Sequence, residues 1–210
     1  MTASQDKNRD NQQPENRKYT LEEYFDFRST AERRFEYHDG QIIPVTSATE
    51  NHGRIVSNLV YLLQSCLRNT DCDVYASDRD VYSEACNRIF YPDLTVICGK
   101  KETMKYSENV VVTLNPTILI EVLSDSTKRF DKTTKKNCYR KIDSLRQYVL
   151  ISQDEKFIEI LERDNASEKS WKTHFYEEGD EIVKIGDCKV LLEDIYHKVE
   201  LAKGEPKSDN

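Results

Sequence analysis

Two carboxylates in the central part of the chain stand where the local sequence makes an acid unusual. Asp93 follows Pro92 at the start of a β-branched run, so we expect it at a bend where a strand begins. Glu121 interrupts the apolar run from Pro116 to Leu123, which has the pattern of a strand buried on both faces. Because a buried, unpaired carboxylate is strongly disfavoured, Glu121 should be neutralised, pair with a cation, or lie where the sheet opens into a pocket.

A divalent metal ion would supply that cation. Two carboxylates are few ligands for a hard ion such as Mg²⁺, which leaves coordination positions for water and phosphate oxygens. In such a site the metal polarises a phosphoryl oxygen and lowers the pKa of a bound water, while a lysine stabilises charge on the phosphate. Lys135 is the candidate lysine, because Asp131, Lys135 and Tyr139 are spaced by four and would share one helix face. This set indicates metal-dependent hydrolysis of a phosphodiester.

The same residues belong to a series of motifs that resembles the Putative restriction endonuclease (Uma2) family of the PD-(D/E)XK nuclease superfamily. The matching blocks follow the family's order between residues 19 and 151. They are Tyr19 to Tyr24, Phe35 to Ile43, His52, Pro92-Asp93, Glu121 to Ser124, Ser126-Thr127, Asp131, Lys135 and Tyr139. Several blocks in order are far more specific than any single block, and Pro-Asp alone would mean little.

The resemblance implies a restriction-endonuclease-like α/β fold, with a mixed β-sheet flanked by helices and a β-rich C-terminal extension. Asp93 and Glu121 would bind Mg²⁺, with Mn²⁺ as a substitute, and the backbone carbonyl of Val122 would be a third protein ligand. The superfamily's Glu-X-Lys pattern puts a lysine where this chain has Leu123. The resemblance therefore implies that the lysine comes from the following helix, as Lys135.

Three further residues and a partner follow from the resemblance. Glu36 matches a conserved acid of the family and is expected to complete or support the metal shell. His52 and Tyr139 are expected to support the metal ligands or to contact a phosphate. The implied function is a DNA endonuclease. A homodimer fits that function, since a single site cuts one strand at a time.

Each assignment has a structural alternative. Asp93 could cap a turn, as aspartate commonly does after proline, and Glu121 could form a structural ion pair with Lys135 or an arginine. Lys135 could be a solvated helix lysine, Glu36 a surface residue, and His52 a helix-end or surface residue. At the level of function, the alternatives are an inactive nuclease-fold module that binds nucleic acid or a protein partner, and a hydrolase of another phosphoester.

The net charge of the chain argues against binding to nucleic acid, whereas a local group of basic residues argues for it. The net charge of −7 opposes binding of a polyanion, because Lys and Arg contacts to phosphates supply most sequence-independent affinity. A basic block nevertheless lies beside the proposed site and comprises Lys128, Arg129, Lys132, Lys135, Lys136, Arg140 and Lys141. Such a block is either a face that follows phosphates or a solvated helix surface.

The 210 residues predict one domain over 18–202, preceded by a disordered arm at 1–17 and followed by a loose tail at 203–210. No long apolar run and no secretory leader is present, so we expect a cytoplasmic protein with no membrane partner. The six cysteines lack Cys-x-x-Cys spacing, which predicts reduced thiols rather than zinc ligands or disulfides. A Cys72–Cys86 pair is conceivable, although nothing in the sequence favours it.

Capping boxes, turns and hydrophobic periodicity predict the order of the elements. Thr20 with Glu23 and Ser47 with Glu50 have capping-box spacing, and Asp39-Gly40 is a strong hairpin turn. The expected helices are 20–28, a long one after 47, and one that carries Lys135 and ends near 143. The expected strands are 34–37, 41–45, 73–76, 80–82, 90–98, 117–123, 147–151, 157–161, 171–176, 182–185 and 190–192.

Overall fold

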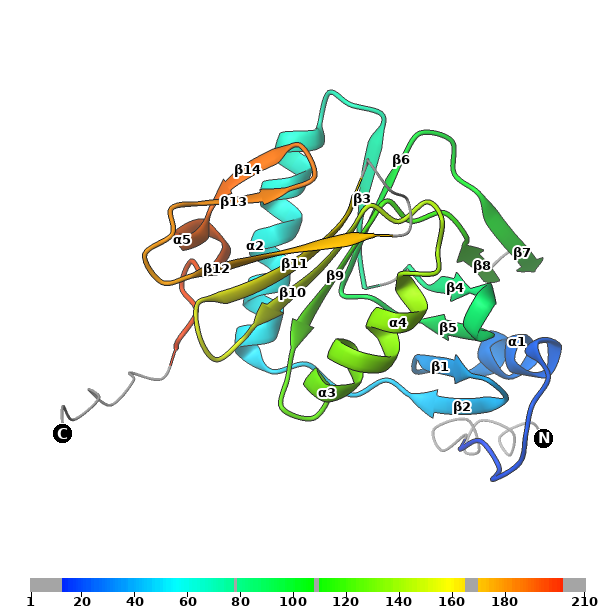
Figure 1. Ribbon diagram of the computed structural model, residues 1–210. Coiled ribbons are helices and arrows are strands. Elements are labelled where there is room, and N and C mark those ends of the chain that lie inside the picture. The colour runs from blue at the N-terminus through cyan, green and yellow to red at the C-terminus, as the bar shows by residue number, and fades with distance from the viewer. Residues whose placement is uncertain (1–12, 78, 108–109, 165–169, 202–210) are drawn as a thin grey trace, which may run out of the picture.

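A mixed six-stranded sheet forms the centre of the computed structural model, which describes residues 13–77, 79–107, 110–164 and 170–201 (Figure 1). The strand order is β12-β11-β10-β9-β6-β3. The strands are β3 (Cys72–Ala76), β6 (Leu94–Cys98), β9 (Ile118–Leu123), β10 (Gln147–Ser152), β11 (Phe157–Arg163) and β12 (Trp171–Glu177). β9 and β10 pair in parallel, and the other neighbours are antiparallel. All six residues of β9 are buried, as its apolar sequence predicts.

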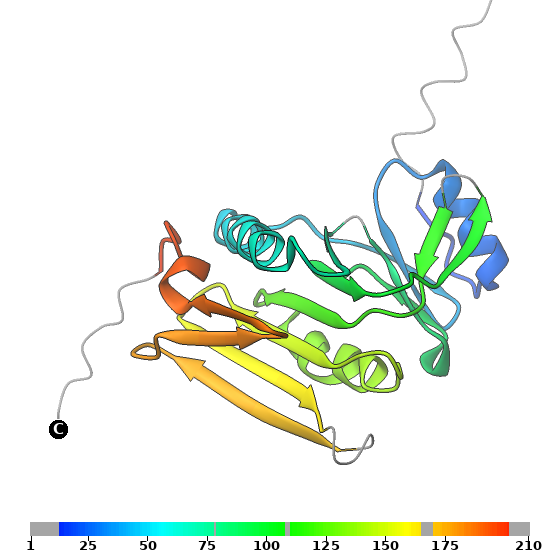
Figure 2. The same ribbon diagram turned by 90° about the horizontal axis from the view of Figure 1, so that it is seen from above.

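Helices cover both faces of this sheet (Figure 2). On one face lies α2 (Glu50–Leu67), which buries Ile55, Leu59, Leu63 and Leu67 at a spacing of four. The hairpin of β13 (Ile182–Ile185) and β14 (Cys188–Leu191), with the short helix α5 (Leu192–Ile195), joins the same hydrophobic cluster. The other face packs against the helical segment of α3 (Lys128–Phe130), η3 (Asp131–Lys135) and α4 (Lys136–Tyr139).

A second six-stranded sheet lies beside the first, in the order β2-β1-β5-β4-β8-β7. Its strands are β1 (Phe35–His38), β2 (Gln41–Pro44), β4 (Val81–Ser83), β5 (Arg88–Phe90), β7 (Thr103–Ser107) and β8 (Val110–Thr113), with the 3₁₀ turn η2 (Glu84–Cys86) after β4. Helix α1 (Leu21–Thr30) packs against this sheet, and the Thr20–Glu23 capping box at its start is formed as predicted. The chain passes from this sheet to the central one between β5 and β6, which is where Asp93 lies.

Most predicted elements are present, but three predictions about them were wrong and some elements were not predicted. The strand expected at 90–98 is divided into β5 and β6 by Tyr91-Pro92-Asp93, because proline has no N–H to donate to a ladder. The cap of α2 is Thr49 instead of Ser47. The helix expected to end near 143 ends at Tyr139 and contains a π-helical turn. Strands β7 and β8 and helix α5 were not predicted.

The predicted arm and tail fall largely outside the described residues, namely 1–12 of the arm and all of 203–210. Within 13–17, the backbone N–H of Glu15 donates to the Tyr19 hydroxyl, and the Arg17 guanidinium lies over the Tyr19 ring. The single domain at 18–202 stays a prediction. In the described part of the chain, no helix has the length and hydropathy needed to cross a membrane.

The prediction of reduced thiols was wrong. The six cysteines form three disulfides, Cys66–Cys188, Cys72–Cys98 and Cys86–Cys138, so Cys72 does not pair with Cys86. Tertiary packing creates each pair: Cys72 and Cys98 are direct partners in the β3–β6 ladder, whereas the other two bridges connect helices to distant segments. Cys86–Cys138 ties α4 to the η2 turn of the second sheet.

Candidate active site

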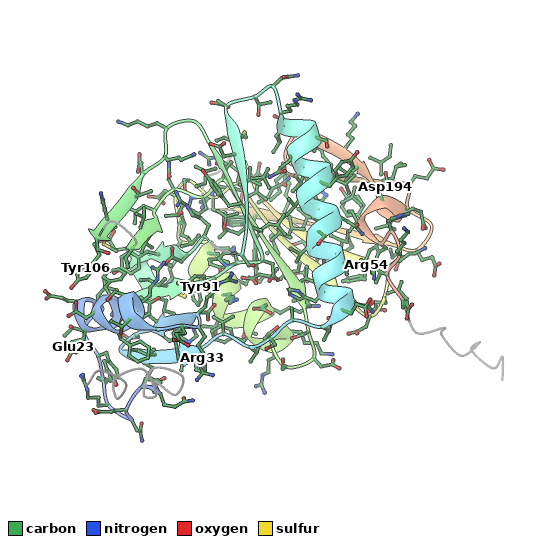
Figure 3. All side chains as sticks on the ribbon, turned by 180° about the vertical axis from the view of Figure 1, so that it is seen from behind. Glu23, Arg33, Arg54, Tyr91, Tyr106 and Asp194 are labelled. Carbon is green, nitrogen blue, oxygen red and sulfur yellow. A yellow bond between two sulfur atoms is a disulfide. The ribbon has the colours of Figure 1, made fainter. Side chains whose placement is uncertain are left out.

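A pocket of about 650 Å³ lies where the two sheets, α2 and the α3–α4 segment meet. Tyr91, labelled in Figure 3, lines it at the passage from the second sheet to the central one. Six of the seven predicted site residues line this pocket, namely Glu36, His52, Asp93, Glu121, Val122 and Lys135. The seventh, Tyr139, reaches the site through a hydrogen bond to Glu121.

Asp93 connects the central sheet to α2. Its Oδ2 accepts hydrogen bonds from the backbone N–H of Val122, at 2.7 Å, and from Nε2 of His52, at 3.0 Å. His52 lies in the first turn of α2, where its own backbone N–H donates to the Thr49 cap. The proline-induced break before β6 thus places Asp93 against the end of β9, and not at a free turn.

Glu121 is the buried acid of β9, with 4% of its surface exposed. Its Oε1 accepts hydrogen bonds from Lys135 Nζ and from the Tyr139 hydroxyl, both at 3.0 Å. Burial raises the pKa of Glu121 well above its usual range, and the Asp131 and Asp93 carboxylates raise it further against the opposing effect of Lys135. Any cation that enters the pocket would therefore stabilise the ionised form of this carboxylate.

Lys135 is buried and its ammonium contacts three carboxylates. Its Nζ lies 3.0 Å from Glu121 Oε1, 3.3 Å from Asp131 Oδ1 and 3.5 Å from Glu36 Oε1. Burial lowers the pKa of Lys135, but the three carboxylates outweigh that effect and hold the pKa well above its usual range. These contacts favour the protonated form of the side chain. It comes from the π-helical turn η3, a type of distortion that is frequent at functional sites.

Glu36 joins the second sheet to the site. Its Oε1 accepts a hydrogen bond of 3.1 Å from the backbone N–H of Tyr91, and its Oε2 lies 2.8 Å from His38 Nε2. Burial raises the pKa of Glu36, but Lys135 and His38 outweigh it, so the pKa falls below its usual value. Glu36 is consequently an ionised partner of Lys135, and not a surface residue.

Two site residues had no role assigned from the sequence. His38 pairs with Glu36 and stacks on Phe130, with 5.1 Å between the ring centroids. Asp131 is buried, and its burial raises its pKa. The alternation of β1, which puts Glu36 and His38 on one face, was a usable signal for His38. Asp131 was already noted for its spacing from Lys135, but its burial depends on packing that the sequence does not display.

The pocket carries more acid than base. Glu36, Asp93, Glu121 and Asp131 line it, against the fixed cations Arg34 and Lys135, so carboxylates exceed these cations by two. Uncompensated charge at a buried site is costly, and a divalent cation would offset this excess.

The donor atoms also suit a hard divalent cation. Among the described residues, Asp93 Oδ1 and Glu121 Oε2 accept no hydrogen bond, although both residues line the pocket. The described ranges contain no group of three or more His, Cys, Asp or Glu side chains that could hold a metal by themselves. The expected metal ligands are not three side chains, because they combine two carboxylates with the backbone carbonyl of Val122. Such an oxygen set fits Mg²⁺, which retains several waters.

The fold is similar to that of a solved structure described as a putative nuclease belonging to DUF820 from Anabaena variabilis ATCC 29413. The TM-score is 0.66 at 18% sequence identity, and the match covers 85% of this chain and 97% of the other. At this identity the likeness defines the class of fold. It confirms the predicted α/β class with mixed sheets flanked by helices.

The family model described as Putative restriction endonuclease, Uma2, matches residues 21–188. The chain belongs to this family. Among its relatives in Synechocystis sp. (strain ATCC 27184 / PCC 6803 / Kazusa) is the uncharacterized protein sll1609, which is 35% identical over 135 residues. That match covers 64% of this chain and 75% of sll1609. The uncharacterized protein slr1290 of the same organism is 27% identical over 148 residues, which cover 70% of this chain and 76% of slr1290.

Proposed function

We propose that this protein is a divalent-metal-dependent endonuclease that hydrolyses phosphodiester bonds of DNA. The observation that carries the proposal is the position of Asp93, Glu121 and Lys135 in one pocket with an excess of carboxylates. The family's description as "Putative restriction endonuclease" and the structural neighbour's description as a "putative nuclease" support the same reaction class. Mg²⁺ is the proposed cofactor and Mn²⁺ its substitute.

The carboxylates of Asp93 and Glu121 would hold the metal together with the Val122 carbonyl. When bound there, the metal supplies a Lewis acid for the phosphoryl oxygen and a water of lowered pKa. Lys135 contributes its ammonium, which donates to the attacking water or to a phosphate oxygen and stabilises charge that develops on the phosphate. The three carboxylates around Lys135 hold its pKa above the usual range, which favours a role as a proton donor over one as a general base.

Four further side chains keep these groups in position. His52 Nε2 donates to the Asp93 carboxylate, and the Tyr139 hydroxyl donates to Glu121. Glu36 and Asp131 hold the Lys135 ammonium from two other directions. Because hydrolysis requires an in-line approach of water to phosphorus, this fixed geometry is the main contribution of the chain itself.

The proposal is tested by incubating supercoiled and single-stranded DNA with the purified protein and Mg²⁺, Mn²⁺ or EDTA. Asp93→Asn and Glu121→Gln should abolish metal-dependent cleavage, whereas Asp187→Asn, at an exposed hairpin turn, serves as the matched control. Undiminished cleavage by either site variant would disprove the assignment. A small phosphodiester in the same assay distinguishes a DNA-directed enzyme from a hydrolase of another phosphoester.

The Lys135–Glu121 pair is also what an inactive, nuclease-fold binding module would retain, since a buried ion pair can be purely structural. Metal titration separates the two functions: affinity for Mg²⁺ or Mn²⁺ that is lost in both acid variants favours the enzyme.

The expected homodimer stays a proposal, to be tested by light scattering. The expected cytoplasmic location also stays a proposal, although three disulfides are unusual in a reducing compartment.

A further inference from the structure

A second cavity, of about 660 Å³, lies beyond the C-terminal end of α4, near the start of β12. It shares no lining residue with the pocket that contains Asp93. Its lining includes the four basic residues Arg140, Lys141, Arg146 and Arg163 together with Asn137, Trp171 and the single acid Asp143. We call it the cationic pocket. In a chain with a net charge of −7, such a local excess of positive charge calls for an explanation.

Arg163 forms part of the framework of this pocket. Its side chain is buried, and Nε donates to the Leu145 carbonyl while Nη2 donates to the carbonyls of Arg140 and Ile142, at 2.8, 3.2 and 2.7 Å. These contacts satisfy carbonyl groups at and after the end of α4, where the helix leaves them without partners. The burial of Arg163 is thus accounted for by the fold.

The other three basic residues have no such structural use. Within the described ranges, Arg140, Lys141 and Arg146 make no ion pair with a carboxylate, although Lys141 Nζ lies 3.7 Å from Cys86 Sγ. Lys141 and Arg146 are exposed, and Arg140 is half-buried. By contrast, the neighbouring Lys132 and Lys136 are paired with Glu159. Positive charge without a carboxylate partner is therefore present at the cationic pocket, whereas Lys132 and Lys136 of the basic block pair with Glu159.

Trp171 limits the movement of Arg140. The guanidinium carbons of Arg163 and Arg140 lie 4.7 and 5.6 Å from the centroid of the Trp171 ring, within the range of cation–π attraction. A guanidinium held in this way loses less side-chain entropy when it binds a ligand, and its planar donors match the oxygens of a phosphate. These properties favour an anion with several oxygens as the ligand.

We propose that the cationic pocket binds a backbone phosphate of the DNA, outside the active site. The proposal rests on the proposed function. Helix α4 links the two sites, because Lys135 immediately before it enters the active-site pocket and Arg140 immediately after it lines the cationic pocket. Five residues of helix span about 7.5 Å along the axis, so the two pockets lie at the two ends of one short helix.

The test measures binding of a labelled DNA duplex by fluorescence anisotropy, in EDTA and over a series of salt concentrations. The variant carries Arg140→Ala and Arg146→Ala. The matched control carries Lys184→Ala and Lys189→Ala, which make the same change of net charge at exposed positions of the β13–β14 hairpin. We expect the variant to bind DNA about tenfold or more weakly at low salt, and the slope of log K against log salt to fall by about 1 to 2. The control should match the wild type.

Equal salt slopes in the two double variants would overturn the proposal, and so would an absence of DNA binding by the wild-type protein. Saturable binding of inorganic phosphate without a response to DNA would overturn it as well, in favour of a small anion. Arg146→Gln, at an exposed position, repeats the measurement without risk to the packing around Trp171. At saturating protein concentration, metal-dependent nicking of supercoiled DNA should persist in the variant. Its absence from the wild type would count against the proposed function, whereas the salt slope decides on the cationic pocket alone.

Discussion

Lys135 Nζ lies 3.0 Å from Glu121 Oε1, and both side chains are almost wholly buried. This contact joins the π-helical turn η3 to strand β9, whose six residues are all buried. It also puts the one buried lysine of the described chain beside the acid whose pKa burial raises most plainly. The proposed catalytic role of Lys135 and the support that it gives the fold thus depend on the same ion pair.

Replacement of Lys135 by methionine should reduce metal-dependent cleavage by about 10²–10³-fold, because it removes a donor that stabilises charge on the phosphate. It should also destabilise the protein at neutral pH by about 3–5 kcal/mol, since it leaves the buried carboxylates uncompensated. Lys136→Met, which removes a half-buried lysine paired with Glu159, is the matched control. Single-turnover cleavage and urea unfolding measure the two effects, and wild-type cleavage by Lys135→Met would exclude the catalytic role.

His52→Ala should weaken metal binding without unfolding the site. The Asp93 carboxylate would keep its hydrogen bond from the Val122 N–H. It would lose the hydrogen bond from His52 Nε2, which helps to fix the orientation of the carboxylate. Partners of this kind typically change metal affinity by about 10–100-fold. We therefore expect the Mg²⁺ concentration for half-maximal cleavage to rise, with a smaller change in the rate at saturating metal. His197→Ala, at an exposed histidine, is the control. If the Mg²⁺ concentration for half-maximal cleavage did not change, His52 would have no role beyond that of a residue at the end of a helix.

The native disulfides can be tested by counting thiols. When the protein is purified without reductant and unfolded in urea, a thiol reagent should detect no free cysteine. After dithiothreitol is added, all six cysteines should react. The Cys66→Ser/Cys188→Ser variant should be less stable to urea by about 2–4 kcal/mol, because that bridge joins residues 122 positions apart and restricts the unfolded chain. Six reactive thiols in the unreduced protein would restore the original expectation of reduced cysteines.

That the candidate acids lie at one place in the fold was easier to predict from the sequence than what surrounds them. Glu121 was identifiable because a charge within an apolar strand needs a partner, and Asp93 because proline marks the strand start. Lys135 followed from helical spacing and family resemblance. The disulfides and the π-helical turn could not be predicted in this way. They arise where distant segments pack together, and local residue patterns carry little information about such contacts.

Asp80 provides the clearest pH dependence. It is buried beside Arg28, directly before strand β4, and burial raises its pKa from 3.8 to about 6 despite the opposing effect of that arginine. The folded protein therefore keeps a proton on Asp80 that the unfolded chain loses near pH 4. Stability from this group is fully present below that pH and is lost as the pH rises to about 6.

Asp80→Asn should remove this contribution and flatten the pH dependence of the unfolding free energy between about pH 4 and pH 6. The shift of pKa corresponds to about 3 kcal/mol, at 1.36 kcal/mol for each pKa unit. Urea titrations of the wild type and Asp80→Asn at four pH values across this window measure the difference. Asp26→Asn is the control, because Asp26 is an exposed acid on the helix that also carries Arg28. Parallel curves for wild type and Asp80→Asn would mean that the Arg28 contact keeps Asp80 ionised, and that its buried charge is compensated.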